Sequence, residues 1–169
     1  MTEAEFAVKL ETHKNTVYRL AFSYLKNIQD AEDVTQEAFL KFFRSDVSFS
    51  APENEKAWLI RVTVNLCKNR FRMNKIRRTI PLYDDATSDG HELMQSNVEL
   101  LELLDKLKPK YRAVVHLFYY ERYTTREIAV MLGKNENTIR TQLARGREYL
   151  REILTDDFGN AVGGVVYES

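Results

Sequence analysis

The chain contains little of what several large classes of protein require. Its 169 residues include a single cysteine, Cys67, which excludes a disulfide within the chain and a cysteine-based zinc cluster. Its six glycines never form the GxGxxG or GxxxxGK phosphate-binding patterns. No apolar run reaches the roughly 20 residues needed to span a bilayer, and the acidic start of the chain lacks the features of a signal peptide. These absences predict a cytoplasmic protein.

The three histidines, His13, His91 and His116, show none of the spacings that bind metals, and none lies beside Cys67 in a nucleophile motif. His13 and His116 fall in line with apolar helix positions, so we expect both, like Cys67, to pack in the interior. The sequence therefore gives no support for an enzyme. It predicts no cofactor, no metal site and no small-molecule substrate.

The formal net charge is zero, from 25 Lys and Arg against 25 Asp and Glu. Evenly mixed charges would argue against a polyanionic partner, but these charges are segregated. The segment from Lys56 to Ile80 has eight basic residues and no acidic one, whereas the segment from Asp84 to Asp105 has seven acidic residues and no basic one. Eight unbalanced cations repel one another, which favours a polyanion-binding role. In the free chain we expect the acidic segment to shield the basic ones.

Helical patterns run along most of the chain. Residues 1–51 contain neither Gly nor Pro, Thr2 with Glu5 forms a capping box, and Asp30 is expected to cap a second helix. Residues 81–97 are rich in Asp, Ser and Asn, and the helical period resumes at Val98. We predict an all-α chain of two small helical domains. Their ranges are residues 1–80 and 98–155, joined by a flexible acidic linker over residues 81–97 and followed by a frayed tail over residues 156–169.

The second domain carries a helix-turn-helix pattern. Thr124 and Glu127 form a capping box, Gly133 falls where a sharp turn needs a positive φ, and Asn135 can cap the next helix. A helix hairpin that only packs on a neighbour is the alternative, but the caps, the turn glycine and the basic outer face together favour DNA binding. The second helix presents Asn137, Thr138, Arg140, Thr141, Arg145 and Arg147. The first four would face base edges, and the last two phosphates.

The basic segment of the first domain combines cations with amide and aromatic side chains, the groups that single-stranded nucleic acid requires. Its amides include Asn65, and its aromatic residues are Trp58 and Phe71. For these two rings we favour packing in the core. For the run of cations we favour a functional role.

These motifs resemble those of the extracytoplasmic-function (ECF) sigma factors, the two-domain class of bacterial RNA polymerase sigma subunits. DAEDVTQEAF at residues 30–39 resembles the helix that binds core polymerase, and the stretch that begins WLIRVTVN at residue 58 resembles the segment that melts and reads the minus-ten element. YRAVV at residue 111, YTTREIA at residue 123 and RGR at residue 145 are similar to the domain that binds the minus-thirty-five element. The resemblance runs from about residue 4 to residue 153. Asn69 and Lys134 depart from the usual pattern.

The resemblance implies three sets of contacts. Core polymerase, through its β′ and β subunits, would be bound by Asp30, Glu32, Asp33, Gln36, Phe39 and Phe43. The opened minus-ten strand of promoter DNA would be held by Arg61, Asn65, Lys68, Arg70 and Arg72. The minus-thirty-five element would be read by the six residues of the second helix given above. The resemblance also implies an inhibitory anti-sigma factor, in many relatives anchored in the membrane. For the acidic linker it implies a path toward the active-site cleft of polymerase, and a merely soluble spacer is the equal alternative.

Two other functions are compatible with the sequence. A stand-alone helix-turn-helix regulator with an N-terminal sensor or dimerisation domain would bind its operator without polymerase, but the segment at residues 30–39 speaks against it. An enzyme acting on nucleic acid would need a carboxylate cluster for Mg²⁺ near the basic helix. Residues 56–80 contain no carboxylate.

Overall fold

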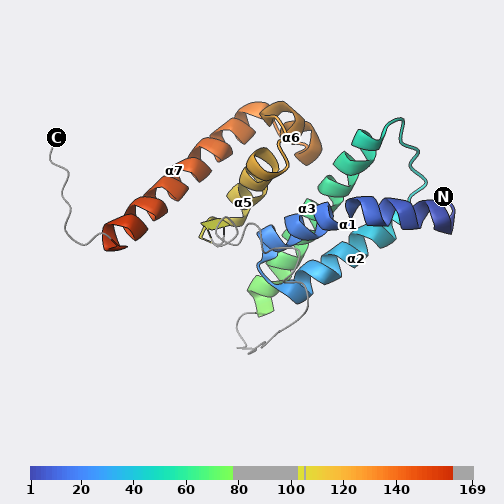
Figure 1. Ribbon diagram of the computed structural model, residues 1–169, viewed down its shortest axis with the longest axis horizontal. Coiled ribbons are helices and arrows are strands. Elements are labelled where there is room, and N and C mark those ends of the chain that lie inside the picture. Colours follow the sequence, from blue (N-terminus) through green and yellow to red (C-terminus); the bar gives the residue numbers. More distant parts are fainter. Residues whose placement is uncertain (78–102, 105, 162–169) are drawn as a thin grey trace.

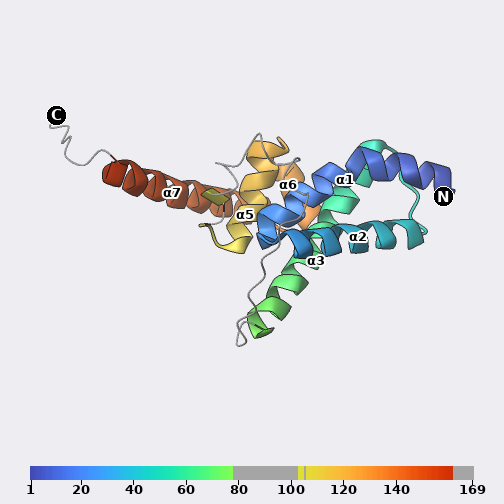
Figure 2. The ribbon, with the colours of Figure 1, turned by 60° about the horizontal axis from the view of Figure 1, so that its bottom comes forward.

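The computed structural model describes residues 1–77, 103–104 and 106–161. Every regular element in these ranges is helical, which confirms the all-α prediction. The elements are α1 (Glu3–Leu25), α2 (Ile28–Arg44), α3 (Pro52–Arg77), α5 (Pro109–Val115), the π-helical turn η2 (His116–Tyr120), α6 (Thr125–Leu132) and α7 (Glu136–Ala161). Helices α1 to α3 form one half of the molecule and α5 to α7 the other, and the C-terminal part of α7 projects away from both (Figures 1 and 2).

Local capping motifs set the starts of the first helices. The side chain of Thr2 accepts from the backbone N–H of Glu5, and the Glu5 carboxylate accepts from that of Thr2, as the capping box predicts. The cap expected at Asp30 is wrong. Helix α1 ends at Leu25, its C-cap Lys26 is in the left-handed conformation (φ 57°), and Asn27 caps α2 by accepting from the backbone N–H of Asp30. The chain thus turns within two residues and leaves Asp30 inside the helix.

The N-terminal half is a three-helix unit closed by aromatic packing. Phe42 of α2 is fully buried, and its ring lies 5.7 Å from that of Trp58 on α3 and 5.9 Å from that of Phe49. Phe71 packs edge-on against Tyr24 of α1. The prediction that Trp58 and Phe71 serve the core is confirmed. Cys67 is also buried, and burial raises the pKa of its thiol, so it is an inert packing group.

A second core joins the two halves. Leu20 of α1 and Ile60 of α3 are fully buried in the same cluster as Leu117, Ile128 and Ile139 from the C-terminal half. A segment of the first half therefore completes the hydrophobic core of the second. The two halves form one packed body in this structure, and they are in contact along α1, α3, α5 and α6.

The C-terminal helix is longer than predicted. Helix α7 continues to Ala161, so the frayed tail expected over residues 156–169 is replaced by helix as far as residue 161. Once a helix has formed, each added residue gains a hydrogen bond at small cost, and this propagation overrides the weak local pattern. The acidic linker predicted at residues 81–97 and the last residues of the tail, 162–169, lie outside the described residues.

Candidate nucleic-acid and polymerase interfaces

The helix-turn-helix is built as its sequence predicts. Thr124 and Glu127 form a complete capping box, and Gly133 adopts φ 62° at the end of α6. The backbone N–H of Lys134 then donates to the carbonyl of Ala129 over 2.9 Å and closes the turn. Asn135 accepts from the backbone N–H of Asn137, which starts α7. The two helices are held by buried apolar residues, so the outer face of α7 is left for a ligand.

The polar residues at the start of α7 are exposed, as a recognition helix requires. Arg140 pairs with Glu136 one turn earlier, at 2.9 Å. A shallow groove between α5 and α7 is lined by Lys110, Tyr111, Asn137, Thr138, Thr141, Gln142 and Arg145. This surface offers hydroxyl and amide groups for base edges, and two cations, Lys110 and Arg145, for phosphates.

The two arginines predicted to contact phosphates are held in place by aromatic neighbours. Arg147 lies over the rings of Phe118 and Tyr119, at 5.3 and 5.4 Å from their centres. Arg145 lies beside the hydroxyl of Tyr111 and lowers the pKa of that group. Such contacts restrict both guanidinium groups before DNA arrives, which reduces the entropy lost on binding.

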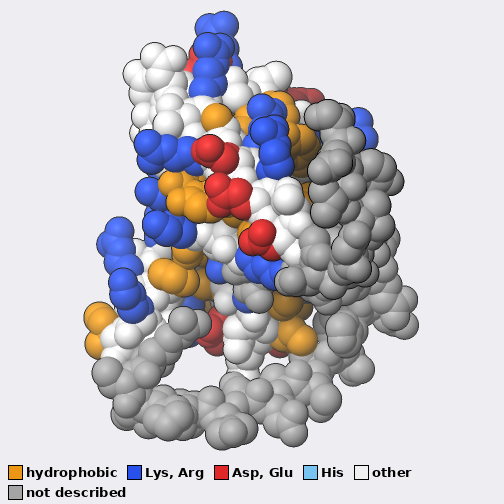
Figure 3. Space-filling model, turned by 90° about the vertical axis from the view of Figure 1, so that its left-hand side faces the viewer, with side chains coloured by type: hydrophobic (Ala, Val, Ile, Leu, Met, Phe, Trp, Pro, Cys, Tyr) orange, Lys and Arg blue, Asp and Glu red, His pale blue; other side chains and the backbone are white. Residues whose placement is uncertain are grey.

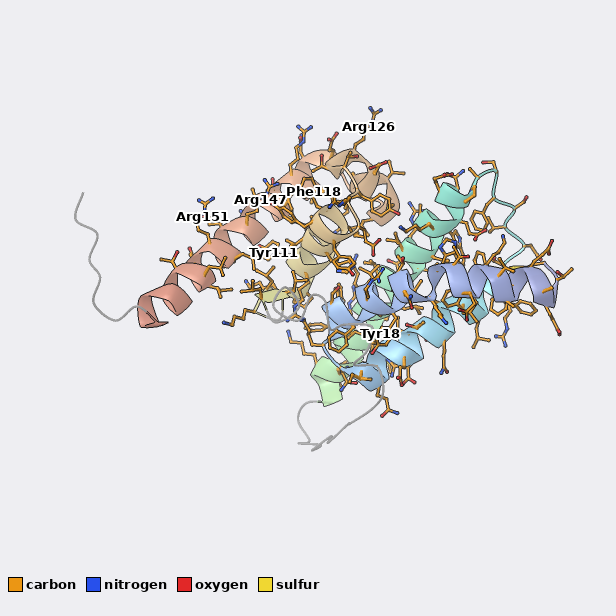
Figure 4. All side chains as sticks on the ribbon, in the orientation of Figure 1. Tyr18, Tyr111, Phe118, Arg126, Arg147 and Arg151 are labelled. Carbon is orange, nitrogen blue, oxygen red and sulfur yellow. The ribbon has the colours of Figure 1, made fainter. Side chains whose placement is uncertain are left out.

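Two further cations on the same side of the molecule were not predicted from the sequence. Arg126 of α6 and Arg151 of α7 are both exposed, and they lie with Arg147 along one outer edge of the C-terminal half (Figure 4). Figure 3 shows Lys and Arg side chains spread along one edge of the end toward which α7 points. The signal was present in the sequence, because Arg151 follows Arg147 by one helical turn. These cations suit the DNA backbone on either side of a groove.

The minus-ten candidates on α3 divide into two groups. Asn65 and Arg72 are exposed. Arg70 instead lies 3.7 Å from both Asp30 and Asp33 of α2. A predicted DNA-binding residue is therefore paired with two predicted polymerase-binding residues, and Asn74 strengthens the contact by donating to Asp30 over 2.7 Å.

Arg61 faces the helix-turn-helix. Its Nη2 and Nε donate to the backbone carbonyls of Val130 and Met131, each over 2.8 Å. Lys68 is also close to this motif. Burial lowers the pKa of Lys134 in the turn, and the positive charge of Lys68 lowers it further. The structure thus brings part of the minus-ten set against the minus-thirty-five half.

The polymerase-binding candidates on α2 are mostly accessible. Glu32 and Gln36 are exposed, and Phe43 is 41% exposed. Phe39 differs from the expected surface position, because it is only 3% exposed and packs edge-on against Phe6 of α1. Its apolar position beyond the main stripe of α2 is explained by α1, which covers it. Leu40, which is 50% exposed, is the neighbouring apolar group that a partner could reach.

Two buried titratable groups lie where the halves meet. His116 is 2% exposed, and burial lowers its pKa despite the neighbouring carboxylate of Glu121 at 3.7 Å. Burial alone would raise the pKa of Glu121, but His116 and Lys56 outweigh it, so the net pKa is lowered and the carboxylate is charged. The buried state expected of His13 and His116 is confirmed.

In the part of the chain that the structure describes, no three His, Cys, Asp or Glu side chains are grouped so that they could hold a metal ion. Within the same residues, no helix combines the length and the apolar character needed to cross a membrane. The features that stand out in these residues are thus helical surfaces with basic, polar and apolar groups.

Comparisons with known proteins identify the two halves. The Sigma-70 region 2 family matches residues 10–76, and the Sigma-70, region 4 family matches residues 97–150. The RNA polymerase sigma factor SigV of Bacillus subtilis (strain 168) is 34% identical over 160 residues, which cover 92% of this chain and 95% of SigV. The ECF RNA polymerase sigma factor SigW of the same organism is 32% identical over 168 residues, with 89% of each chain covered.

Two solved structures share the fold. The sigma factor RpoE from Bartonella quintana, in complex with the anti-sigma factor NepR, has a TM-score of 0.72 and 21% identity over 89% of this chain and 97% of that one. CnrH, in complex with the cytosolic domain of CnrY, has a TM-score of 0.66 and 22% identity over 92% of this chain and 91% of that one.

Together, the fold and the exposed surfaces define a two-part helical transcription factor. The chain belongs to the ECF subfamily of bacterial RNA polymerase sigma factors. Two ordered family matches along one chain also remove the alternative of a stand-alone regulator with an unrelated sensor domain.

Proposed function

We propose that this sigma factor directs promoter-specific initiation through three surfaces, one on each of α2, α3 and α7. It binds core RNA polymerase and promoter DNA, and the polymerase makes the phosphodiester bonds. The observation that carries the proposal is the complete helix-turn-helix with an exposed polar recognition face, on the same chain as a separate basic helix. Each half offers only a small surface, so the two gain affinity through effective concentration once polymerase holds both.

The accessible part of α2 would dock on the β′ subunit. Glu32, Asp33 and Gln36 supply the polar contacts, and Leu40 and Phe43 supply an apolar edge. An amphipathic surface of this kind fits the helices of a partner. Phe39 would act from within, by keeping α2 packed on α1.

Helix α3 would hold the opened strand at the minus-ten element. Asn65 can read an unstacked base on its edge, and the cations Arg61, Lys68, Arg70 and Arg72 can contact the backbone phosphates. Trapping the opened strand lowers the free energy of the open complex. Sequence-specific contacts at the minus-thirty-five element would come from the start of α7, where Asn137, Thr138, Arg140 and Thr141 face a major groove.

The proposal places the protein in the cytoplasm, with the polymerase. An anti-sigma factor, membrane-anchored or not, would be its inhibitory partner, as NepR and CnrY accompany the sigma factors of similar fold. The domain ranges proposed from the sequence, residues 1–80 and 98–155, would then separate the two promoter contacts by the linker at residues 81–97.

The direct test is reconstituted transcription. Purified chain, core polymerase and a library of templates with randomised upstream sequence should together yield transcripts from a defined minority of templates, and polymerase alone should not. Sequencing those templates gives the promoter. A chain that does not co-elute with core polymerase, or that selects no upstream sequence, would contradict the proposal.

A further inference from the structure

The turn η2 follows α5 directly and has the hydrogen-bond spacing of a π-helix. The backbone N–H of Glu121 donates to the carbonyl of His116, five residues earlier, over 3.1 Å, where an α-helix would use the carbonyl four residues earlier. The turn therefore contains one extra residue, which changes the direction of its side chains. Turns of this kind are frequent at functional sites. His116 and Leu117 point into the core, whereas Tyr119 is 48% exposed.

Two aromatic residues of η2 meet Arg147 of α7. The guanidinium of Arg147 lies over the rings of Phe118 and Tyr119, 5.3 and 5.4 Å from their centres, and its Nε donates to the hydroxyl of Tyr119. The two rings pack edge to face, with their centres 5.0 Å apart. The side chain of Arg147 is therefore fixed by two rings and one hydrogen bond.

These contacts do not use the groups that bind phosphate. A guanidinium has several N–H donors, and the bond to Tyr119 takes only the one on Nε. A tyrosine hydroxyl that accepts a hydrogen bond still has its own O–H to donate. These partners of Arg147 are uncharged, whereas Arg140 of the same helix pairs with the carboxylate of Glu136. Arg147 and Tyr119 thus present a positive charge with adjacent N–H and O–H donors, which suits the oxygens of a phosphate.

The pair of Tyr119 and Arg147 lies on an edge that carries other cations. Arg126 of α6 and Arg151 of α7 are exposed and lie with Arg147 along one outer edge of the C-terminal half (Figure 4). Cations spaced along an edge match the regularly spaced charges of a DNA backbone. We infer that Tyr119 and Arg147 form one phosphate-binding site for promoter DNA, in which the hydroxyl of Tyr119 positions Arg147 and also donates to the phosphate. This inference rests on the proposed function and adds a residue outside the helix-turn-helix to its minus-thirty-five surface.

Tyr119→Phe tests the site, because it removes the hydroxyl and keeps the ring under Arg147. The measurement is the affinity of holoenzyme, reconstituted from the full chain and core polymerase, for the promoter obtained by template selection. We expect about fivefold weaker binding, the effect of roughly one hydrogen bond. The loss should be the same for every minus-thirty-five sequence, because phosphate contacts carry no sequence information. Tyr149→Phe is the matched control, since it removes the hydroxyl of another exposed tyrosine and should leave the affinity unchanged.

Salt dependence and a double variant separate the site from a merely structural contact. Arg147→Gln removes a charge, so it should reduce the slope of log affinity against log salt by about one, whereas Tyr119→Phe should leave the slope unchanged. Tyr119→Phe should also weaken binding less in the Arg147→Gln background than in the parent chain, because part of its effect acts through Arg147. Equal effects in both backgrounds, or parent affinity for Tyr119→Phe, would overturn the site and leave the proposed function intact. A parent holoenzyme that selects no promoter would overturn the proposed function itself.

Discussion

A β-carbon placed on Gly146 of α7 would lie 2.8 Å from Cγ2 of Val115 on α5. Real β-carbons do not approach other atoms so closely, and Val115 is fully enclosed with a stiff, β-branched side chain. The contact between α5 and α7 therefore depends on the absence of a side chain at position 146. This glycine also separates Arg145 from Arg147, so the packing of the two helices positions both cations.

Gly146→Ala should destabilise the protein. Alanine in place of glycine would favour a free helix by about 1 kcal/mol, but overpacking a filled interior costs roughly 1–3 kcal/mol. We expect a net loss of up to about 2 kcal/mol in the free energy of unfolding, measured by urea denaturation. Val115→Ala should then cost less stability in the Gly146→Ala background than in the parent chain, because it also removes the methyl group that clashes. An alanine variant more stable than the parent would contradict the close approach.

Glu55→Ala should loosen α1 from α3. The Glu55 carboxylate is 6% exposed, lies 3.0 Å from Nε2 of His13 and pairs with Lys9 of the same helix. We expect a loss of about 2 kcal/mol, below the roughly 3–5 kcal/mol of a fully buried pair because Lys9 is partly exposed. Glu53→Ala is the matched control, since it removes an exposed carboxylate from the same first turn of α3. Equal losses in urea denaturation would show that the contacts of Glu55 add nothing beyond the helix dipole.

The structural features that could be predicted from the sequence are the local ones. The capping boxes at Thr2 and Thr124 and the positive φ of Gly133 involve residues within a few positions of one another. Their hydrogen bonds form whenever the helix itself forms, so the sequence pattern predicts these helix ends correctly. The prediction for the cap of α2 was wrong because Asn27 and Asp30 both favour the N-cap position. The left-handed conformation of Lys26, which was not predicted, selects Asn27.

The contacts that could not be predicted are the ones between distant segments. Arg61 and Val130 are 69 positions apart, and Lys56 and Glu121 are 65 apart. A run of cations in the sequence shows that a surface is basic, but it does not show which cations another part of the same chain will occupy. Phe39 was placed at the partner surface for a similar reason, since only the fold shows that Phe6 lies against it.

Acidification should destabilise the protein through His116. Burial lowers the pKa of His116 in the folded state, so the unfolded chain, with a pKa of about 6.5, binds the proton more readily. The contribution of neutral His116 to the free energy of unfolding is then fully present above the unfolded pKa. It is lost as the pH drops from there toward the folded pKa, by at most about 1.4 kcal/mol per pH unit. Urea denaturation between pH 7.5 and 5.5 measures this slope.

His116→Gln is the control for the pH experiment. It removes the titrating group, so the difference in stability between the parent chain and the variant should shrink as the pH falls through this range. Glu121 titrates lower, because its net pKa is held below the usual carboxylate value, and it should add nothing to the difference above pH 5. A difference that stays constant with pH would rule out His116 as the source.

Arg140→Ala and Arg145→Ala should separate base reading from phosphate contact. Arg140 lies near the start of α7, exposed and paired with Glu136, whereas Arg145 lies further along α7, where it lines the groove beside Tyr111. Both variants should weaken promoter binding by the reconstituted holoenzyme. Arg140→Ala alone should also lose discrimination at one base pair, by about 1–3 kcal/mol. Affinities across all single substitutions of the minus-thirty-five element measure this, and two variants with the same uniform loss would remove Arg140 from base reading.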